Sequence, residues 1–222
     1  GERHFGKPLY CQLTEGDDIH LTFHGALKDY QVPVMDKYVA HVLQDPVNGG
    51  CGLLELYCAW GKTAGTLCAI SRLGKKALVI VHKEFLMNQW IERIHQFLPG
   101  ARIGRIQGDV MDIEDKDIVI CMLQSLSQKD YPSSLFDSFG FTIIDEVHHI
   151  SSEVFSRALF KLVTKYMLGL SATMNRKDGT TSIFKMFLGE VVCKQVRDVE
   201  EDVIVRGITY QIADPEYNHV EL

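Results

Sequence analysis

Short apolar runs alternate with helical stretches through most of this chain, and that alternation constrains the fold more than any other feature. Six runs have strand character: residues 52–57, 77–81, 102–106, 117–123, 141–144 and 166–170. Stretches of helical character separate several of them: residues 63–72, 85–97 and 153–165. Continuous apolar strands that alternate with helices are typical of parallel sheets covered on both faces. The sequence therefore predicts an α/β fold with a parallel sheet and helices on both faces.

The two ends of the chain follow other patterns. Before the alternation we expect a strand at 19–23, a helix at 30–43 and a turn at 48–50, and after it strands at 191–194 and 203–211. We therefore predict three parts: an N-terminal extension at 1–26, a main domain at 27–190, and edge strands or a linker at 191–222. Because the chain begins with Gly instead of Met, we expect it to be part of a longer polypeptide.

Composition excludes some classes of protein and supports others. With 222 residues, 46% of them hydrophobic, the chain can bury a full core. Its net charge of −6 gives no support to a dedicated nucleic-acid-binding domain, which is more often basic. The six cysteines form no CxxC pair, which favours reduced thiols in an intracellular protein. The apolar runs are far shorter than the ~18 residues that span a bilayer, so no membrane partner is expected.

The first candidate site is the segment at 58–63, between the strand at 52–57 and the helix at 63–72. Backbone N–H groups at a helix N-terminus bind phosphate, a lysine reaches the terminal phosphates, and a threonine hydroxyl binds Mg²⁺. These roles fall to Ala59, Gly61, Lys62 and Thr63. The loop is poor in glycine, however, because Leu56 stands in the first glycine position of G-x-x-x-x-G-K-[ST]. On its own this match is a weak signal.

Two further candidates also follow apolar strands. Asp145 and Glu146 come after the strand at 141–144, where one carboxylate can hold Mg²⁺ and the other can activate water. The alternative is an acidic pair that caps a helix. Ser171 and Thr173 follow the strand at 166–170 and can either couple neighbouring elements or cap a helix.

The order and spacing of these three segments, each after a strand, resemble motifs I, II and III of the superfamily 2 helicases of the DExH type. The resemblance covers residues 27–189 and implies a RecA-like P-loop domain, the first of two, with ATP and Mg²⁺ as cofactors. The segment at 169–179 is similar to the XPB-like branch. Within that branch the chain resembles the transcription-associated helicases of poxviruses and other large DNA viruses.

The resemblance also assigns roles to residues outside the three motifs. Residues 27–31 resemble the upstream motif in which a glutamine, here Gln31, reads adenine. Residues 79–83 with 89–90, and residues 122–126, look like motifs Ia and Ic, which line the nucleic-acid track. This similarity implies that Lys83 and Gln124 contact nucleic acid.

The family's mechanism is hydrolysis of the β–γ bond of ATP. It implies that Lys62 and the loop amides bind the phosphates, that Thr63 and Asp145 hold Mg²⁺, and that Glu146 activates water. His148, Ser171 and Thr173 would couple the nucleotide site to the track. The arginine finger would come from a second RecA-like domain of the same polypeptide, so we expect this chain alone to hydrolyse ATP poorly.

The implied partners are DNA, with RNA as an alternative, and the transcription machinery. A viral protein would act in the host cytoplasm or the virion, and any other in the nucleus or cytoplasm. Two other functions stay open: a degenerate, non-catalytic P-loop scaffold, and the motor subunit of a restriction nuclease.

Three residues in or beside the loop depart from the family pattern. Tyr57 replaces a usual proline, Ala59 a usual glycine, and Trp60 a residue that is often small. A left-handed backbone at Ala59 would cost about 1 kcal/mol relative to glycine. Trp60 either packs against a neighbour or stacks on a ligand. Arg102 and Arg105 lie where the family often contacts the nucleic-acid backbone, with a solvated face as the alternative for each.

Overall fold

A computed structural model describes residues 13–47, 49–162, 164–173 and 180–196. Its strands form one sheet in the order β4-β3-β5-β2-β6-β7-β1-β8. Their bounds are β1 Gly50–Leu56, β2 Ala77–Val81, β3 Ile103–Gln107, β4 Val110–Met111, β5 Ile118–Met122, β6 Phe141–Ile144, β7 Tyr166–Ser171 and β8 Val191–Gln195. Every neighbouring pair is parallel except β3 and β4. The predicted α/β fold is confirmed, with one short antiparallel strand added at an edge.

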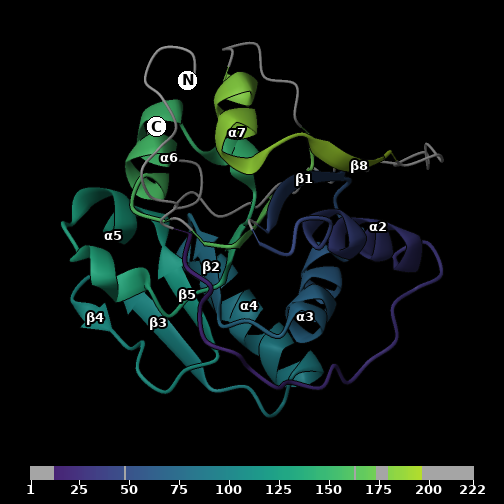
Figure 1. Ribbon diagram of the computed structural model, residues 1–222, viewed down its shortest axis with the longest axis horizontal. Coiled ribbons are helices and arrows are strands. Elements are labelled where there is room, and N and C mark those ends of the chain that lie inside the picture. The colour runs from purple at the N-terminus through teal and green to yellow at the C-terminus, as the bar shows by residue number, and fades with distance from the viewer. Residues whose placement is uncertain (1–12, 48, 163, 174–179, 197–222) are drawn as a thin grey trace, which may run out of the picture.

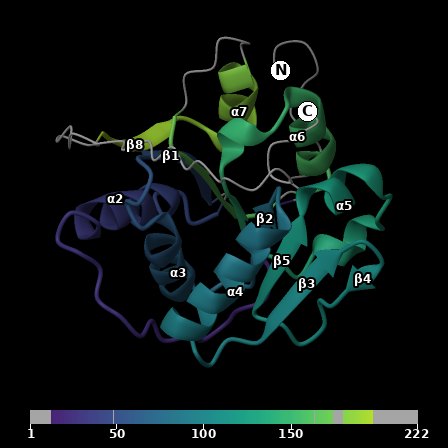
Figure 2. The ribbon, with the colours of Figure 1, turned by 180° about the vertical axis from the view of Figure 1, so that it is seen from behind.

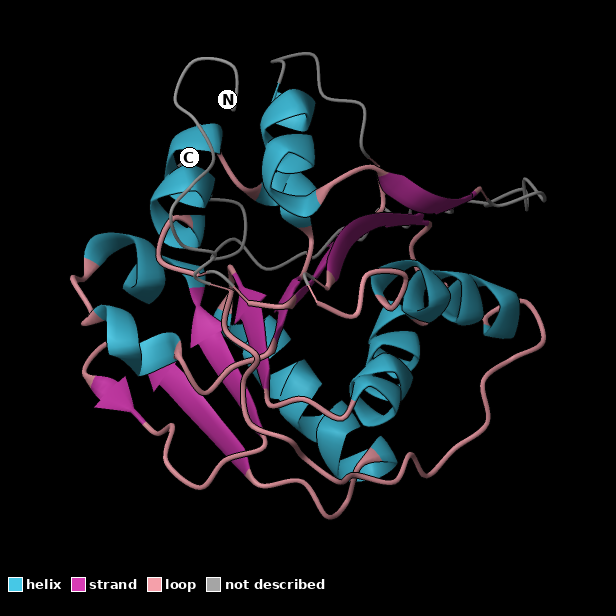
Figure 3. Ribbon diagram, in the orientation of Figure 1, coloured by secondary structure: helices cyan, strands magenta, loops and turns pink. Residues whose placement is uncertain are grey.

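Helices cover both faces of this sheet, as Figures 1 and 2 show from opposite sides. One face carries α2 Val32–Val42, α3 Lys62–Leu73 and α4 Glu84–Phe97. The other carries α5 Leu123–Gln128, α6 Ser152–Leu159 and α7 Thr180–Leu188, with the short 3₁₀ helices η1 Ser133–Phe136 and η2 Val147–His149. Figure 3 shows the strands between these two groups of helices.

The central strand β2 explains why the sequence has continuous apolar runs. Ala77, Val79 and Val81 belong to the core on the α2–α3–α4 face, and Leu78 and Ile80 to the core on the opposite face. Successive side chains of a strand point to opposite faces, so a strand covered on both sides buries all of them. Each fully buried Leu, Ile or Val contributes about 1.5–3 kcal/mol through the hydrophobic effect.

One predicted element is wrong and another is too long. Residues 19–23 form no strand, and the neighbouring Asp18 makes only an isolated bridge to Lys75. Ile19 is buried and donates its backbone N–H to Gly74 at the end of α3, so this segment packs against helix ends and pairs with no strand. The helix predicted at 153–165 ends at Leu159. Beyond it the Thr164 hydroxyl hydrogen-bonds the Thr142 hydroxyl of β6 and the Tyr166 carbonyl. These bonds hold the segment just before β7 against β6.

Other predictions changed at element boundaries or lie beyond what the structure describes. The α5 helix and β4 were not predicted, and Gly50 of the expected turn already belongs to β1. The run at 191–194 forms β8, at the edge of the sheet beside β1. The strand predicted at 203–211 and residues 175–179 of the XPB-like segment lie outside the described residues. Within the described ranges, no helix is long and apolar enough to cross a membrane.

The sheet order determines where the candidate residues meet. Strands β2, β6, β7 and β1 are consecutive neighbours and run parallel. Their carboxyl ends therefore lie side by side at one end of the sheet, which we call the carboxyl edge. The opposite end, where the strands begin, we call the amino edge. Ligands of open parallel sheets bind at this kind of edge.

Candidate functional site

A pocket of about 480 Å³ lies at the carboxyl edge. Its lining comes from four separate parts of the sequence: residues 26, 28 and 31, residues 58–64, positions 86, 89, 93 and 97 of α4, and Asp145 with Glu146. The structure thus brings Gln31, the phosphate loop and the two acidic residues into one cavity, although more than a hundred positions separate the first from the last in the sequence.

The phosphate loop contains two residues with a left-handed backbone. Gly61 has φ of 90° and directly precedes α3, where Lys62 is the first helical residue and Thr63 the second. This left-handed conformation favours glycine, and a Cβ at position 61 would lie 2.4 Å from the Gln31 amide nitrogen and displace that side chain from the Trp60 carbonyl. Ala59 has φ of 67°. The loop therefore adopts the left-handed conformation at Ala59 despite the cost to a residue with a Cβ.

Trp60 and Gln31 hold this loop in place. Trp60 is fully buried and its ring meets Tyr30 edge-on, so the packing alternative for Trp60 is the one observed. The Gln31 amide donates to the Trp60 carbonyl at 2.8 Å, and its Oε1 accepts from the Lys28 backbone N–H at 2.8 Å. A primary amide has two donors and two acceptor positions, so Gln31 keeps one of each for a ligand.

Lys62 and Glu146 form an ion pair across the pocket. The Lys62 ammonium lies 2.8 Å from Glu146 Oε1, and the two side chains are 12% and 21% exposed. Glu146 itself has a left-handed backbone with φ of 52°, which turns it away from the line of β6. Among the described residues, Glu146 Oε2 is buried and accepts no hydrogen bond, although His148 Nδ1 lies 3.2 Å from it. Lys62 can therefore exchange this carboxylate for phosphate, and Glu146 keeps an oxygen that can accept a proton.

Asp145 is buried at the end of β6, where its Oδ2 accepts a 2.8 Å hydrogen bond from the Trp90 indole. Burial raises the pKa of the Asp145 carboxyl, and the Trp90 hydrogen bond opposes that rise. Thr63 lines the same pocket. A carboxylate and a hydroxyl are oxygen ligands of the kind that Mg²⁺ prefers, so Asp145 and Thr63 fit a magnesium site.

His148 connects the acidic pair to β7. Its Nδ1 lies 3.1 Å from Ser171 Oγ and 3.2 Å from Glu146 Oε2. The Ser171 hydroxyl donates to the Thr173 carbonyl at 2.6 Å and accepts from the Thr173 N–H at 3.2 Å. With the hydroxyl proton directed to Thr173, Nδ1 of His148 is the donor toward Ser171. The predicted coupling residues thus form one chain of contacts that begins at Glu146.

The two predicted nucleic-acid contacts lie at the ends of neighbouring strands. Lys83 follows β2 and Gln124 follows β5, and both side chains are exposed. The Gln124 amide donates to the His82 carbonyl at 2.9 Å, which links the two loops. Arg102 lies at the other edge of the sheet, where it binds Asp117 through its backbone N–H and its guanidinium. Arg102 therefore makes a structural contact while its side chain stays 59% exposed, and Arg105 is exposed on β3, so the solvated-face alternative fits both residues.

Sequence reasoning missed the partners of two site residues. Trp90 was recognised only as part of a track motif, and no sequence signal shows that its indole reaches Asp145. His82 belongs to the segment at 79–83 that resembles motif Ia, and no role is predicted for His149. Their rings lie 5.1 Å apart, and the His149 ring lies 4.1 Å from that of His148. Burial lowers the pKa of His82 and of His148, and in both cases neighbouring positive groups contribute to the shift.

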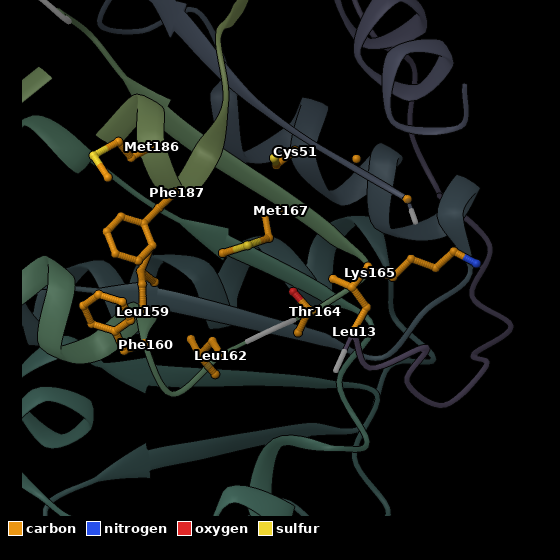
Figure 4. A pocket seen from close by; sticks show the side chains of 12 residues that line it. Leu13, Cys51, Leu159, Phe160, Leu162, Thr164, Lys165, Met167, Met186 and Phe187 are labelled. Atoms are coloured by element: carbon orange, nitrogen blue, oxygen red, sulfur yellow. The ribbon is translucent and has the colours of Figure 1, made fainter. Parts of the chain in front are cut away.

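A second pocket, of about 410 Å³, lies at the start of β1 and β7, and Figure 4 shows the Leu, Met and Phe side chains around it. The fold already engages its polar groups. The Thr164 hydroxyl bonds Thr142 and Tyr166, and the Lys165 ammonium pairs with Glu15. Because catalysis needs converging polar groups that are free to meet a ligand, the chemical site is the pocket at the carboxyl edge.

Comparison with protein families assigns the chain to a class. Residues 24–176 match the family described as type III restriction enzyme, res subunit, so the chain belongs to that family. A protein of Acanthamoeba polyphaga mimivirus, named as an ATP-dependent RNA helicase, is 33% identical over 88% of this chain. One of African swine fever virus with the same kind of name is 31% identical over 74%. The chain spans only 37% and 32% of these two proteins.

Solved structures show the same fold. The SWI2/SNF2 ATPase core of Sulfolobus solfataricus, solved with double-stranded DNA, matches 80% of this chain and 38% of its own, with a TM-score of 0.62 and 22% identity. The UvsW helicase of bacteriophage T4 matches 80% of this chain and 64% of its own, with a TM-score of 0.61 and 19% identity. The domain is therefore a RecA-like fold of the helicase type.

Proposed function

We propose that this chain is the ATP-binding half of a nucleic-acid-dependent helicase or translocase that hydrolyses ATP. The observation that carries the proposal is the convergence of Lys62, Asp145 and Glu146 in one pocket at the ends of β1 and β6. Membership of the family and the helicase names of the viral relatives support it.

The residues divide the work of hydrolysis. Backbone N–H groups at the start of α3 and the Lys62 ammonium bind the phosphates. Thr63 and Asp145 would hold Mg²⁺, which would offset the charge that develops on the phosphates. Because Lys62 pairs with Glu146 in this structure, phosphate that draws Lys62 away also frees the carboxylate to accept a proton from water. His148 and Ser171 then carry that change toward the track beside Lys83 and Gln124.

The rest of the motor lies outside this chain in the proposal. The viral relatives are two to three times as long, which leaves room for a second RecA-like domain with an arginine finger. We propose DNA as the track, in transcription or genome processing within the host cytoplasm or the virion. The XPB-like segment and the viral relatives motivate this choice. RNA is the alternative, because two relatives are named as RNA helicases.

Nucleic-acid-stimulated ATP hydrolysis by the full-length protein tests the proposal. Glu146→Gln should keep nucleotide binding and lose at least about 100-fold in turnover, since it removes a group that acts on the reacting water. Lys62→Ala should lose both nucleotide binding and ATP turnover. Parallel assays with duplex DNA, single-stranded DNA and RNA identify the track.

The same assay separates the other functions. Wild-type turnover no higher than that of the two variants would replace the motor with a non-catalytic scaffold, which the irregular loop at Ala59 and Trp60 motivates. Cleavage of the DNA in the same reactions would identify a restriction-nuclease motor, which the family description motivates.

A further inference from the structure

The Asp145 carboxylate is hydrogen-bonded by a residue of α4, a helix that carries none of the predicted ATP-binding motifs. Trp90 lies in the middle of α4 and is 1% exposed, and Asp145 is 6% exposed. The indole Nε1 donates to Asp145 Oδ2 at 2.8 Å. The Glu146 backbone N–H also hydrogen-bonds this carboxylate. Trp90 is the side chain that holds Oδ2, and Asp145 lines the pocket beside Lys62 and Glu146, where a ligand can reach its carboxylate.

A hydrogen bond of this kind controls orientation. A carboxylate rotates readily about its last torsion, which is broad and roughly two-fold. A buried donor at one oxygen selects one of the two positions and fixes which oxygen faces the pocket. Partners that orient metal-binding side chains typically contribute 10–100-fold to metal affinity or activity.

The two tryptophans of the chain show that this contact is specific. Both rings are buried, but among the described residues the Nε1 of Trp60 has no acceptor, whereas that of Trp90 meets a carboxylate. Burial of an indole in this fold therefore does not by itself bring an acceptor to its N–H.

We propose that Trp90 is a positioning residue for the metal-binding carboxylate: its indole N–H holds Asp145 Oδ2 and presents Oδ1 to the metal that accompanies ATP. The inference rests on the proposed function, because it assigns a partner to the same site. It makes α4, which already lines the nucleotide pocket, part of the metal site as well.

Direct metal binding tests this role. The full-length protein with bound ADP is titrated with Mn²⁺ and followed by electron paramagnetic resonance, and ADP affinity is measured separately in EDTA. Trp90→Phe keeps the aromatic ring and removes the donor, and it should weaken Mn²⁺ binding about 10-fold or more while metal-free ADP affinity stays unchanged. The Mg²⁺ concentration for half-maximal ATP hydrolysis should rise by a similar factor.

Tyr38→Phe is the matched control. It removes another buried donor, the hydroxyl that bonds the Met167 carbonyl at 3.0 Å, on a helix outside the metal site. It should lower the melting temperature without changing Mn²⁺ affinity. Should Trp90→Phe fail to fold, benzothienylalanine at position 90 keeps the ring shape and lacks the N–H, and it should weaken Mn²⁺ binding in the same way.

The outcomes separate this inference from the proposed function. Wild-type affinity for Mn²⁺ in Trp90→Phe, or an equal loss of ADP binding with and without metal, would overturn the positioning role and leave the ATP site intact. A wild-type protein that binds neither ADP nor Mn²⁺·ADP would overturn both.

Discussion

The two edges of the sheet carry similar polar residues and use them differently. At the carboxyl edge, Lys62, Asp145 and Glu146 converge on one pocket. At the amino edge, Asp117 is just as buried as Asp145, but its carboxylate receives three hydrogen bonds from Arg102. Buried carboxylates therefore mark a chemical site here only where the fold leaves part of their bonding capacity unused.

The amino edge shows the same pattern at its lysines. The Lys76 ammonium is buried and donates to the Ile113 carbonyl, Lys75 pairs with Asp18, and Lys165 pairs with Glu15. Each of these contacts ties a strand end to a neighbouring loop. At the carboxyl edge the lysine pairs instead with a carboxylate that has a second function in the proposed reaction. The comparison predicts that substitutions at the carboxyl edge change ligand binding, whereas those at the amino edge change stability.

Loss of the Lys62 ammonium should have the largest effect. Lys62→Ala removes a partly buried charge from the pocket and should weaken Mg·ATP binding about 100-fold or more, as measured by calorimetry on the full-length protein. Lys165→Ala is the control at the amino edge, where the ion pair lies outside the pocket, and it should bind ATP normally. Equal losses of ATP affinity in the two variants would contradict the predicted difference between the two edges.

Gln31 should contribute the next largest effect on binding. Gln31→Ala removes both the anchor of the Trp60 carbonyl and the predicted adenine contact, and it should raise the Kd for ATP about 10-fold and reduce the preference for ATP over GTP. Competition with a fluorescent nucleotide measures both. Gln128→Ala, an exposed change at the end of α5 on the opposite face of the sheet, should leave both values at wild type. An unchanged ATP preference in Gln31→Ala would remove the adenine role.

Loss of the Asp117 carboxylate should lower the stability of the fold and leave nucleotide binding unchanged. Burial opposes ionisation of this carboxyl, but the hydrogen bonds and charge of Arg102 outweigh it, so the pKa of Asp117 lies below its ordinary value. A depressed pKa stabilises the fold above the ordinary aspartate value, and that stability is lost as pH falls through the folded-state pKa. Asp117→Asn should thus cost about 1–2 kcal/mol at pH 7, and less in acid.

Urea unfolding across a pH series measures this difference. The control is Asp112→Asn, which breaks an exposed pair with Lys116 and should change stability by less than about 0.5 kcal/mol. A loss for Asp117→Asn that is independent of pH would show that the ionised carboxylate is not the stabilising group.

The smallest expected effect concerns the backbone conformation of the phosphate loop. Ala59→Gly should stabilise the protein by about 1 kcal/mol, or roughly 2–4 °C in melting temperature, because glycine adopts the left-handed conformation without strain. Ala64→Gly makes the same exchange in the right-handed α3 helix and should destabilise by a similar amount. Destabilisation by both would show that Ala59 is not left-handed in solution.

Much of the fold could be predicted because apolar runs report burial directly. The strands at 77–81 and 141–144 match β2 and β6 at both ends, since all of their side chains lie in the core. The wrong elements have other causes. Residues 19–23 have the pattern of a strand, but Ile19 donates its backbone N–H to Gly74 at the end of α3. The helix after Ser152 ends at Leu159, and Thr164 then bonds across to β6. Neither cause is visible in local sequence.

Part of the candidate site could also be predicted from the sequence, and part of it could not. Lys62, Asp145 and Glu146 could be placed together because parallel strands end at one edge, and the structure brings them into one pocket. The contacts of Trp90 with Asp145 and of Gln31 with Trp60 could not be predicted, because they depend on how helices pack against the sheet. The contact of Arg102 with Asp117, which lies just before β5, could not be predicted for a similar reason, because it depends on the pairing of β3 with β5.

Hydrogen–deuterium exchange of the full-length protein, with and without Mg²⁺ and a non-hydrolysable ATP analogue, tests most directly whether the carboxyl edge is the nucleotide site. Bound nucleotide should slow the exchange of backbone amides at 58–66 and 145–149 and leave those at 102–118 unchanged, because only the first two segments belong to the pocket. Exchange that slows mainly around the amino edge or the apolar pocket, or that does not change anywhere, would contradict the assignment.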